Sequence, residues 1–166
     1  TIAIAEHHGP CYLRFGRPKW PVFTDPNQKF EIGKAWTIQE GTDVTIFATG
    51  HLVWKAMEAA NELEQQGLSV ELINIHTIKP LDDAAILKSA SKTGCVVTAE
   101  EHQMNGGLGD SVCQLLARNT PTPVEMVAVD DQFGESGKPE QLLDKYGLGT
   151  VNIVEAVQKV IARKNG

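Results

Sequence analysis

The chain has 166 residues, a formal net charge of −6 and 42% hydrophobic residues, which is typical of ordinary globular domains. Its apolar runs are shorter than the roughly 20 residues of a transmembrane helix, and no Lys/Arg cluster suggests binding to nucleic acid or anionic membranes. Three cysteines, Cys11, Cys95 and Cys113, are too few for a disulfide framework, so we expect a reducing compartment and a cytoplasmic protein.

The first part of the chain is rich in proline and glycine. Residues 11–15 alternate as a β-strand does, and we expect a short strand there. The prolines of residues 18–27 cannot continue a central ladder, so this stretch is expected to be a connector. We therefore predict that residues 1–25 end a preceding domain and that residues 26–166 form an α/β domain. Because the sequence starts at Thr1 rather than Met, we expect it to be a piece of a longer protein.

Strand and helix patterns alternate from Asp43 onward. Strands are expected over residues 44–49, 70–75, 95–99 and 124–129, and helices over 52–66, 82–93, 108–119, 139–146 and 152–164. Asn152 and Glu155 have the spacing of a capping box at the start of the last helix. This alternation predicts an α/β fold of three layers, a mostly parallel sheet with helices on both faces.

Two features lie at the end of the third predicted strand of the alternating region. Glu100 and His102 should share one side of the strand, and such a pair could perform acid–base chemistry or form an interface contact. Gly106, Gly107 and Gly109 follow directly, where free amides at a helix start could bind an anion. However, the dinucleotide-binding pattern of glycines is incomplete there, so the glycines could equally serve a sharp turn.

Arg14 and Arg17 flank Gly16 at the end of the first predicted strand. Two guanidinium groups so placed could bind a phosphate or could form a salt bridge at a domain boundary. Asp130, Asp131 and Glu135 could offer oxygens to a divalent cation, although they lack the regular spacing of a calcium loop. We predict no metal site and no complete catalytic site, because no serine elbow, Cys–His pair or metal-ligand spacing is present.

Several phrases of the sequence together resemble one family. These are residues 43–50 (DVTIFATG), 77–82 (TIKPLD), 100–102 (EEH) with 106–109 (GGLG), and 133–137 (FGESG). In this order they are similar to the C-terminal domain of transketolase-like thiamine diphosphate enzymes. Residues 9–18 (GPCYLRFGRP) are similar to the last strand of the pyrimidine-binding domain that precedes it in that family.

The resemblance implies a function that the residues alone do not. Transketolases of the pentose phosphate pathway transfer a two-carbon ketol unit between sugar phosphates with thiamine diphosphate and a cation such as magnesium. The resemblance implies that both cofactors bind outside this chain, on upstream pyrophosphate- and pyrimidine-binding domains or an N-terminal subunit. It also implies that the complete enzyme is a homodimer and that this piece supports assembly without being catalytic alone.

One site residue follows from the motif match. The family has an arginine at the end of the last pyrimidine-domain strand that binds the substrate phosphate, and Arg17 stands at that position, with Arg14 as a second candidate. Gly16 replaces the serine of the longer transketolases.

Three other functions remain open. They are a 2-oxo acid dehydrogenase β-subunit, the C-terminal domain of 1-deoxyxylulose-5-phosphate synthase, and a free-standing nucleotide-binding regulatory module.

Overall fold

The computed structural model describes all residues from Thr1 to Gly166. Its sheet has five strands in the order β1-β3-β2-β4-β5. The strands are β1 (Trp36–Gln39), β2 (Val44–Ala48), β3 (Val70–Asn74), β4 (Val96–Gln103) and β5 (Val124–Val129). Strands β2 to β5 are parallel, and only the edge strand β1 runs antiparallel, beside β3.

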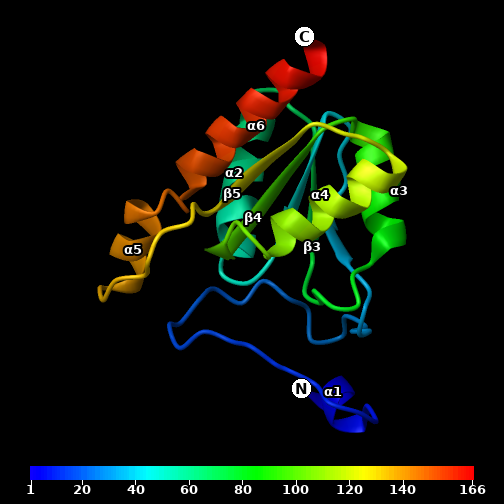
Figure 1. The fold of residues 1–166 in the computed structure, drawn as a ribbon, viewed down its shortest axis with the longest axis vertical. Coiled ribbons are helices and arrows are strands. Elements are labelled where there is room, and N and C mark those ends of the chain that lie inside the picture. The colour runs from blue at the N-terminus through cyan, green and yellow to red at the C-terminus, as the bar shows by residue number, and fades with distance from the viewer.

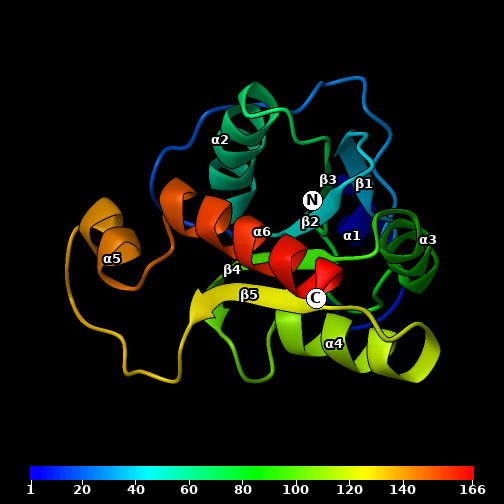
Figure 2. The same cartoon turned by 90° about the horizontal axis from the view of Figure 1, so that it is seen from above.

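Helices cover both faces of this sheet, as Figure 2 shows from above. The helices are α1 (Ile2–Glu6), α2 (Leu52–Gln65), α3 (Asp83–Thr93), α4 (Leu108–Asn119), α5 (Pro139–Lys145) and α6 (Thr150–Asn165). Helices α2 and α6 pack on one face around one hydrophobic cluster, and α3 and α4 pack on the other face around a second cluster. The predicted three-layer α/β fold is confirmed.

The central elements form where the sequence patterns place them. All five residues of β2 are buried, because this strand lies in the middle of the sheet with a helix layer on each face. Asp82 caps the start of helix α3, and its carboxylate accepts a hydrogen bond from the Ala85 amide. It ends at Gly94, which has a left-handed φ of +72°.

The connections of the sheet create a topological switch point between β2 and β4. The chain leaves β2 through α2 toward β3 on one face, and it leaves β4 through α4 toward β5 on the opposite face. A crevice forms at the carboxyl ends of two such strands, and doubly wound folds bind their ligands there. Figure 1 shows the N-terminal part of the chain running beneath this end of the sheet.

Three local predictions are wrong. Residues 11–15 are extended but form no strand, because no sheet edge pairs with them: residues 8–24 make no backbone–backbone hydrogen bond. The edge strand β1 was not predicted, because it is short and its ladder is interrupted between Thr37 and Gln39. Helix α6 begins at Thr150 rather than Asn152, and Asn152 accepts a hydrogen bond from the Gly149 amide.

None of the helices combines the length and the apolar composition that crossing a membrane requires. The first strand of the sheet domain starts at Trp36. Residues 7–26, called the arm below, connect α1 to the rest of the chain without regular structure. The boundary predicted after residue 25 falls at the end of this arm and stays a prediction.

Candidate functional site

The end of β4 presents two adjacent carboxylates to opposite faces of the sheet. Glu100 points toward the start of α4, and Glu101 points toward the start of α2. This follows from the alternation of side chains along a strand. Each carboxylate therefore meets a different helix N-terminus, where unpaired amides and the helix dipole favour a negative charge.

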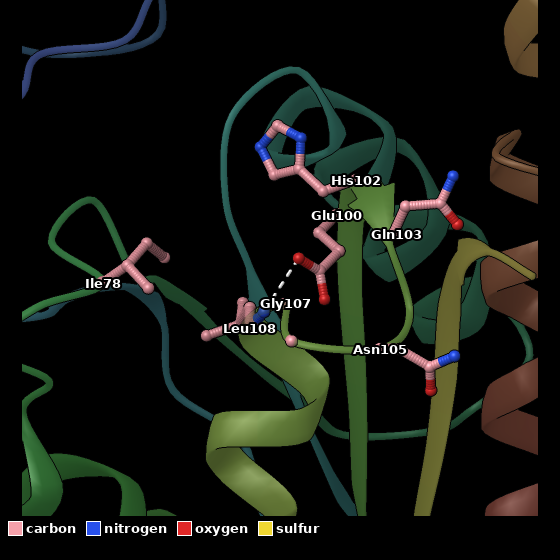
Figure 3. A pocket seen from close by; sticks show the side chains of 8 residues that line it. Ile78, Glu100, His102, Gln103, Asn105, Gly107 and Leu108 are labelled. Carbon is pink, nitrogen blue, oxygen red and sulfur yellow. Dashed lines mark hydrogen bonds between the residues drawn. The ribbon is translucent and has the colours of Figure 1, made fainter. Parts of the chain in front are cut away.

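Glu100 is buried, with 1% of its surface exposed. Its two oxygens accept hydrogen bonds from the amides of Leu108 and Gly109, each at 2.8 Å. Figure 3 shows the bond to Leu108. Both amides belong to the first turn of α4. Because the chain's own carboxylate takes both of their hydrogens, they are not free to bind a phosphate or another anion.

The glycines of this loop are explained by close contacts. A Cβ at Gly107 would lie 2.6 Å from the carbonyl oxygen of Gln103, and a Cβ at Gly109 would lie 2.7 Å from the Thr98 hydroxyl. Both distances are too short for a side chain, whereas Gly106 has open space and a left-handed φ of +79°. The glycines thus let the chain turn tightly from β4 into α4.

A pocket of about 220 Å³ opens beside this turn. Its lining includes Glu100 and His102, which share one side of the strand end as the alternation predicts, and Ile78 from the segment after β3 (Figure 3). The Glu100 oxygens in this lining are the ones that accept from the α4 amides. The pocket therefore offers the His102 imidazole and backbone groups rather than a free Glu–His pair.

Glu101 lies at the topological switch point between β2 and β4, on the face of the sheet opposite to Glu100. Its side chain is 13% exposed, and Oε2 accepts a hydrogen bond of 3.0 Å from the amide of His51, the residue before α2. Gly50 has a φ of +59°, and a Cβ there would lie 2.7 Å from the carboxylate carbon of Glu101. The tight turn after β2 therefore requires a glycine to receive this carboxylate.

Arg14 of the arm joins the same cluster. Its Nη1 lies 3.5 Å from Glu101 Oε1 and contacts both ring nitrogens of His102. His102 Nε2 is 4.0 Å from the same carboxylate oxygen. The structure thus brings Arg14 and His102 together around Glu101. The sequence pointed to Arg14 and His102 as parts of two separate sites and did not connect either of them with Glu101.

Arg17 has a different environment. It is exposed, lies at a bend of the arm, and makes no hydrogen bond or ion pair. Gly16 just before it packs against the imidazole of His51, and Trp20 lies over the same ring with a centroid distance of 4.8 Å. The two candidate arginines therefore differ, since Arg14 is paired and Arg17 is free.

The remaining acidic candidates do not form a site. Asp130, Asp131 and Glu135 are exposed, and Glu135 pairs with Lys145. No group of three or more His, Cys, Asp or Glu side chains in the structure is arranged to hold a metal ion.

Sequence reasoning did not select Glu101, and it did not pair Glu101 with His51 or Arg14. Their contacts join positions 50 and 87 residues apart, and local patterns carry no signal at such separations. The signal available in the sequence is the pair Gly50-His51 after strand β2 together with the pair Glu100-Glu101 at the end of strand β4. These two strands are neighbours in the sheet.

The chain is similar to known proteins over nearly its whole length. Residues 33–153 match the family model described as "Transketolase, C-terminal domain". The chain is 46% identical to the 6-deoxy-6-sulfo-D-fructose transketolase subunit SqwH of Clostridium sp. (strain MSTE9), a match that covers 98% of this chain and 50% of that protein. It is 40% identical to human transketolase-like protein 2, covering 92% of this chain and 25% of that protein.

A solved structure is similar in three dimensions as well. The protein described as "Split gene transketolase, inactive beta4 tetramer" superposes with a TM-score of 0.93 at 44% identity, covering 98% of this chain and 55% of that chain. The chain thus spans about half the length of the split relatives that it matches. With a family match over most of its residues, the chain belongs to the transketolase C-terminal domain family.

Proposed function

We propose that this chain is the C-terminal part of a transketolase, an enzyme that transfers a two-carbon ketol unit between sugar phosphates. Its own role in that enzyme is to support assembly and to supply Arg17 as a ligand of the substrate phosphate. The observation that carries this role is the free, exposed guanidinium of Arg17 on an arm whose neighbouring residues are held by the sheet domain.

A guanidinium suits this task. It forms two parallel hydrogen bonds to a phosphate, and its charge does not depend on pH in the physiological range. Binding the remote phosphate orients the sugar carbonyl at the reacting centre, so part of the binding energy lowers the barrier to transfer. Arg14 cannot do the same while its guanidinium is engaged with Glu101.

Thiamine diphosphate and its magnesium ion do not fit the residues of this chain. The diphosphate and its cation need carboxylate or amide oxygens around the metal, and no suitable group of side chains gathers here. The amides of the α4 N-terminus are taken by Glu100. We therefore place both cofactors on upstream domains or an N-terminal subunit, in a complete enzyme that is dimeric, and we derive no step through them here.

The names of the relatives support this division of labour. The solved relative is described as an inactive tetramer of a split-gene transketolase, and SqwH is named a transketolase subunit. A free-standing nucleotide-binding module is disfavoured, because the glycine loop has no free amides at the start of α4. A 2-oxo acid dehydrogenase subunit would have no use for a phosphate ligand at Arg17.

The test is Arg17→Ala in the complete enzyme, assayed with a phosphorylated sugar and its analogue without phosphate. Losing hydrogen bonds to a charged group costs about 1.5–3 kcal/mol, so KM for the phosphorylated sugar should rise roughly 10- to 150-fold. Arg118→Ala, at an exposed position on α4, is the matched control and should leave KM unchanged. Equal losses for both sugars would contradict the phosphate role.

The similarity to SqwH suggests a sulfonated sugar as a second candidate substrate. Its name specifies a sugar that carries a sulfonate at carbon 6. A sulfonate also presents three oxygens to a guanidinium, so the same assay should include a 6-sulfonated sugar. A lower KM for the sulfonate than for the phosphate in the unmodified enzyme would assign this chain to the sulfonate substrates.

A further inference from the structure

The arm is held in place by side chains and not by its backbone. Residues 8–24 make no backbone–backbone hydrogen bond, so no ladder fixes their position on the sheet. Their contacts with the sheet domain include the Arg14 pairing, the packing of Gly16 and Trp20 on His51, and the stacking of Phe23 on Trp36. Trp20 and Phe23 also pack against the hydrophobic cluster under α2 and α6. The position of Arg17 therefore depends on the residues that grip the arm on either side of it.

Glu101 provides the charged contact that holds the arm. One of its oxygens binds the amide at the start of α2, and the other faces the guanidinium of Arg14. The Glu101 side chain is 13% exposed and that of Arg14 is 51% exposed, so solvent reaches the pair mainly from the Arg14 side. A carboxylate fixed at a helix N-terminus is a rigid anchor, because helix and turn both hold its orientation.

His51 provides the packing contact that holds the arm. A Cβ on Gly16 would overlap the imidazole, so the backbone of the arm lies directly on this ring. Trp20 covers the same ring at a centroid distance of 4.8 Å. Arg17 and its bend lie between these two contacts, with Gly16 before it and Trp20 after it.

We propose that Glu101 and His51 are positioning residues that set the place of Arg17, and that Arg14 is their anchor on the arm rather than a second phosphate ligand. The proposal rests on the proposed function, because it concerns the phosphate site of that enzyme. It gives the C-terminal domain a part in substrate binding in addition to its part in assembly. It also accounts for Gly16, the glycine that directly precedes Arg17 in the arm.

The charged contact is tested by Glu101→Gln in the complete enzyme. The glutamine keeps an acceptor for the His51 amide but loses the attraction for Arg14. We expect KM for a phosphorylated sugar to rise by at least about fivefold more than KM for the sugar without phosphate, the size of a coupling between residues in contact. Glu62→Gln, an exposed position on α2, is the matched control. A fall in kcat alone, or an equal rise in both KM values, would overturn the proposal.

The packing contact is tested by a rescue. Gly16→Ser adds a side chain that overlaps His51, so it should displace the arm and raise KM for the phosphorylated sugar. His51→Ala removes the ring, and the double variant should recover toward the unmodified enzyme. A double variant no better than Gly16→Ser alone, or a harmless Gly16→Ser, would show that the contact does not position Arg17.

A readout without substrate separates this proposal from the proposed function. Tryptic cleavage after Lys19 reports how firmly the arm is docked, and it should become faster in Glu101→Gln but not in Arg17→Ala or Glu62→Gln. If Arg17→Ala raises KM equally for the two sugars while Glu101→Gln speeds cleavage, the proposed function fails and the anchoring stands. If cleavage is unchanged in Glu101→Gln, the anchoring itself is wrong.

Discussion

Two consecutive glutamates at the end of β4 stabilise two different helix starts. Glu100 accepts from α4 on one face and Glu101 accepts from the residue before α2 on the other. A strand is the only regular element that sends neighbouring side chains to opposite faces, so one dipeptide can serve both layers. Because the switch point lies between β2 and β4, the two helix starts flank the crevice in which a doubly wound fold binds ligands.

At the residue scale, the Glu100→Gln variant tests how much this arrangement stabilises the fold. A glutamine has one acceptor oxygen, so one of the two amides at the start of α4 loses its partner in a buried place. We expect the free energy of unfolding to fall by about 2–3 kcal/mol, measured by urea denaturation.

The control for this prediction is Glu62→Gln, which makes the same chemical change at an exposed position of α2. It should alter the free energy of unfolding by less than about 0.5 kcal/mol. If Glu100→Gln were as mild as this control, the carboxylate at the α4 start would not contribute to stability.

The sequence predicts side-chain direction better than it predicts partners. The alternation rule correctly separates Glu100 from Glu101, because it depends only on neighbouring positions, whereas the His102 ring lines the pocket beside Glu100 and also comes within 4.0 Å of Glu101. It could not find Arg14 as a partner of Glu101 across 87 positions, because that contact exists only once the arm has folded beneath the sheet. A phosphate role for both arginines was therefore reasonable from the sequence, and their different environments became visible only in the fold.

At the element scale, buried elements were predictable and edge elements were not. The strands β2 to β5 and helices α2 to α4 have runs or stripes of apolar residues that repeat with the period of the element. Strand β1 and residues 11–15 have similar short patterns, yet only β1 finds a free edge to pair with. Short strands are decided by available partners, which a local pattern does not contain.

The packing of α3 on β3 includes a buried charge that has its own partner. Glu71 of β3 is 3% exposed and lies 2.9 Å from the Lys92 ammonium of α3. Ser89 donates a further hydrogen bond to the same carboxylate. Lys92 donates hydrogen bonds to Glu40 and to Glu71, and these bonds raise the pKa of the lysine, the one to Glu40 more strongly. The lysine therefore stays charged.

The Lys92→Met variant should therefore expose the cost of an unpaired buried carboxylate. Removing one partner of a fully buried pair costs about 3–5 kcal/mol, and we expect about 2 kcal/mol here because about a third of the lysine side chain is exposed. Adding Glu71→Gln removes the buried charge and should restore part of the loss, as measured by thermal unfolding. Additive losses in the double variant would show that the two side chains do not interact.

At the scale of the whole molecule, the apolar surface is unevenly distributed. The sheet domain buries most of its large apolar side chains in its two clusters, although Ile78, Phe133 and Val151 are exposed. By contrast, Tyr12, Phe15 and Val22 of the arm are each more than 80% exposed. Large exposed apolar side chains close together mark surfaces that contact another protein part. In the proposed enzyme, we expect these side chains to pack against the upstream domains, so that the arm is held from both sides.

The proposed division of labour leads to a prediction for the isolated chain. It should show no ketol transfer and no heat of thiamine diphosphate binding by calorimetry, because its residues offer neither a metal site nor free amides at the glycine loop. Supplying the upstream domains or the N-terminal subunit should restore both, whereas the Arg17→Ala chain should restore cofactor binding but not efficient use of phosphorylated sugars. Calorimetric binding of the cofactor to this chain alone would contradict the placement of the cofactor site, since no other part of the enzyme would then be needed to hold it.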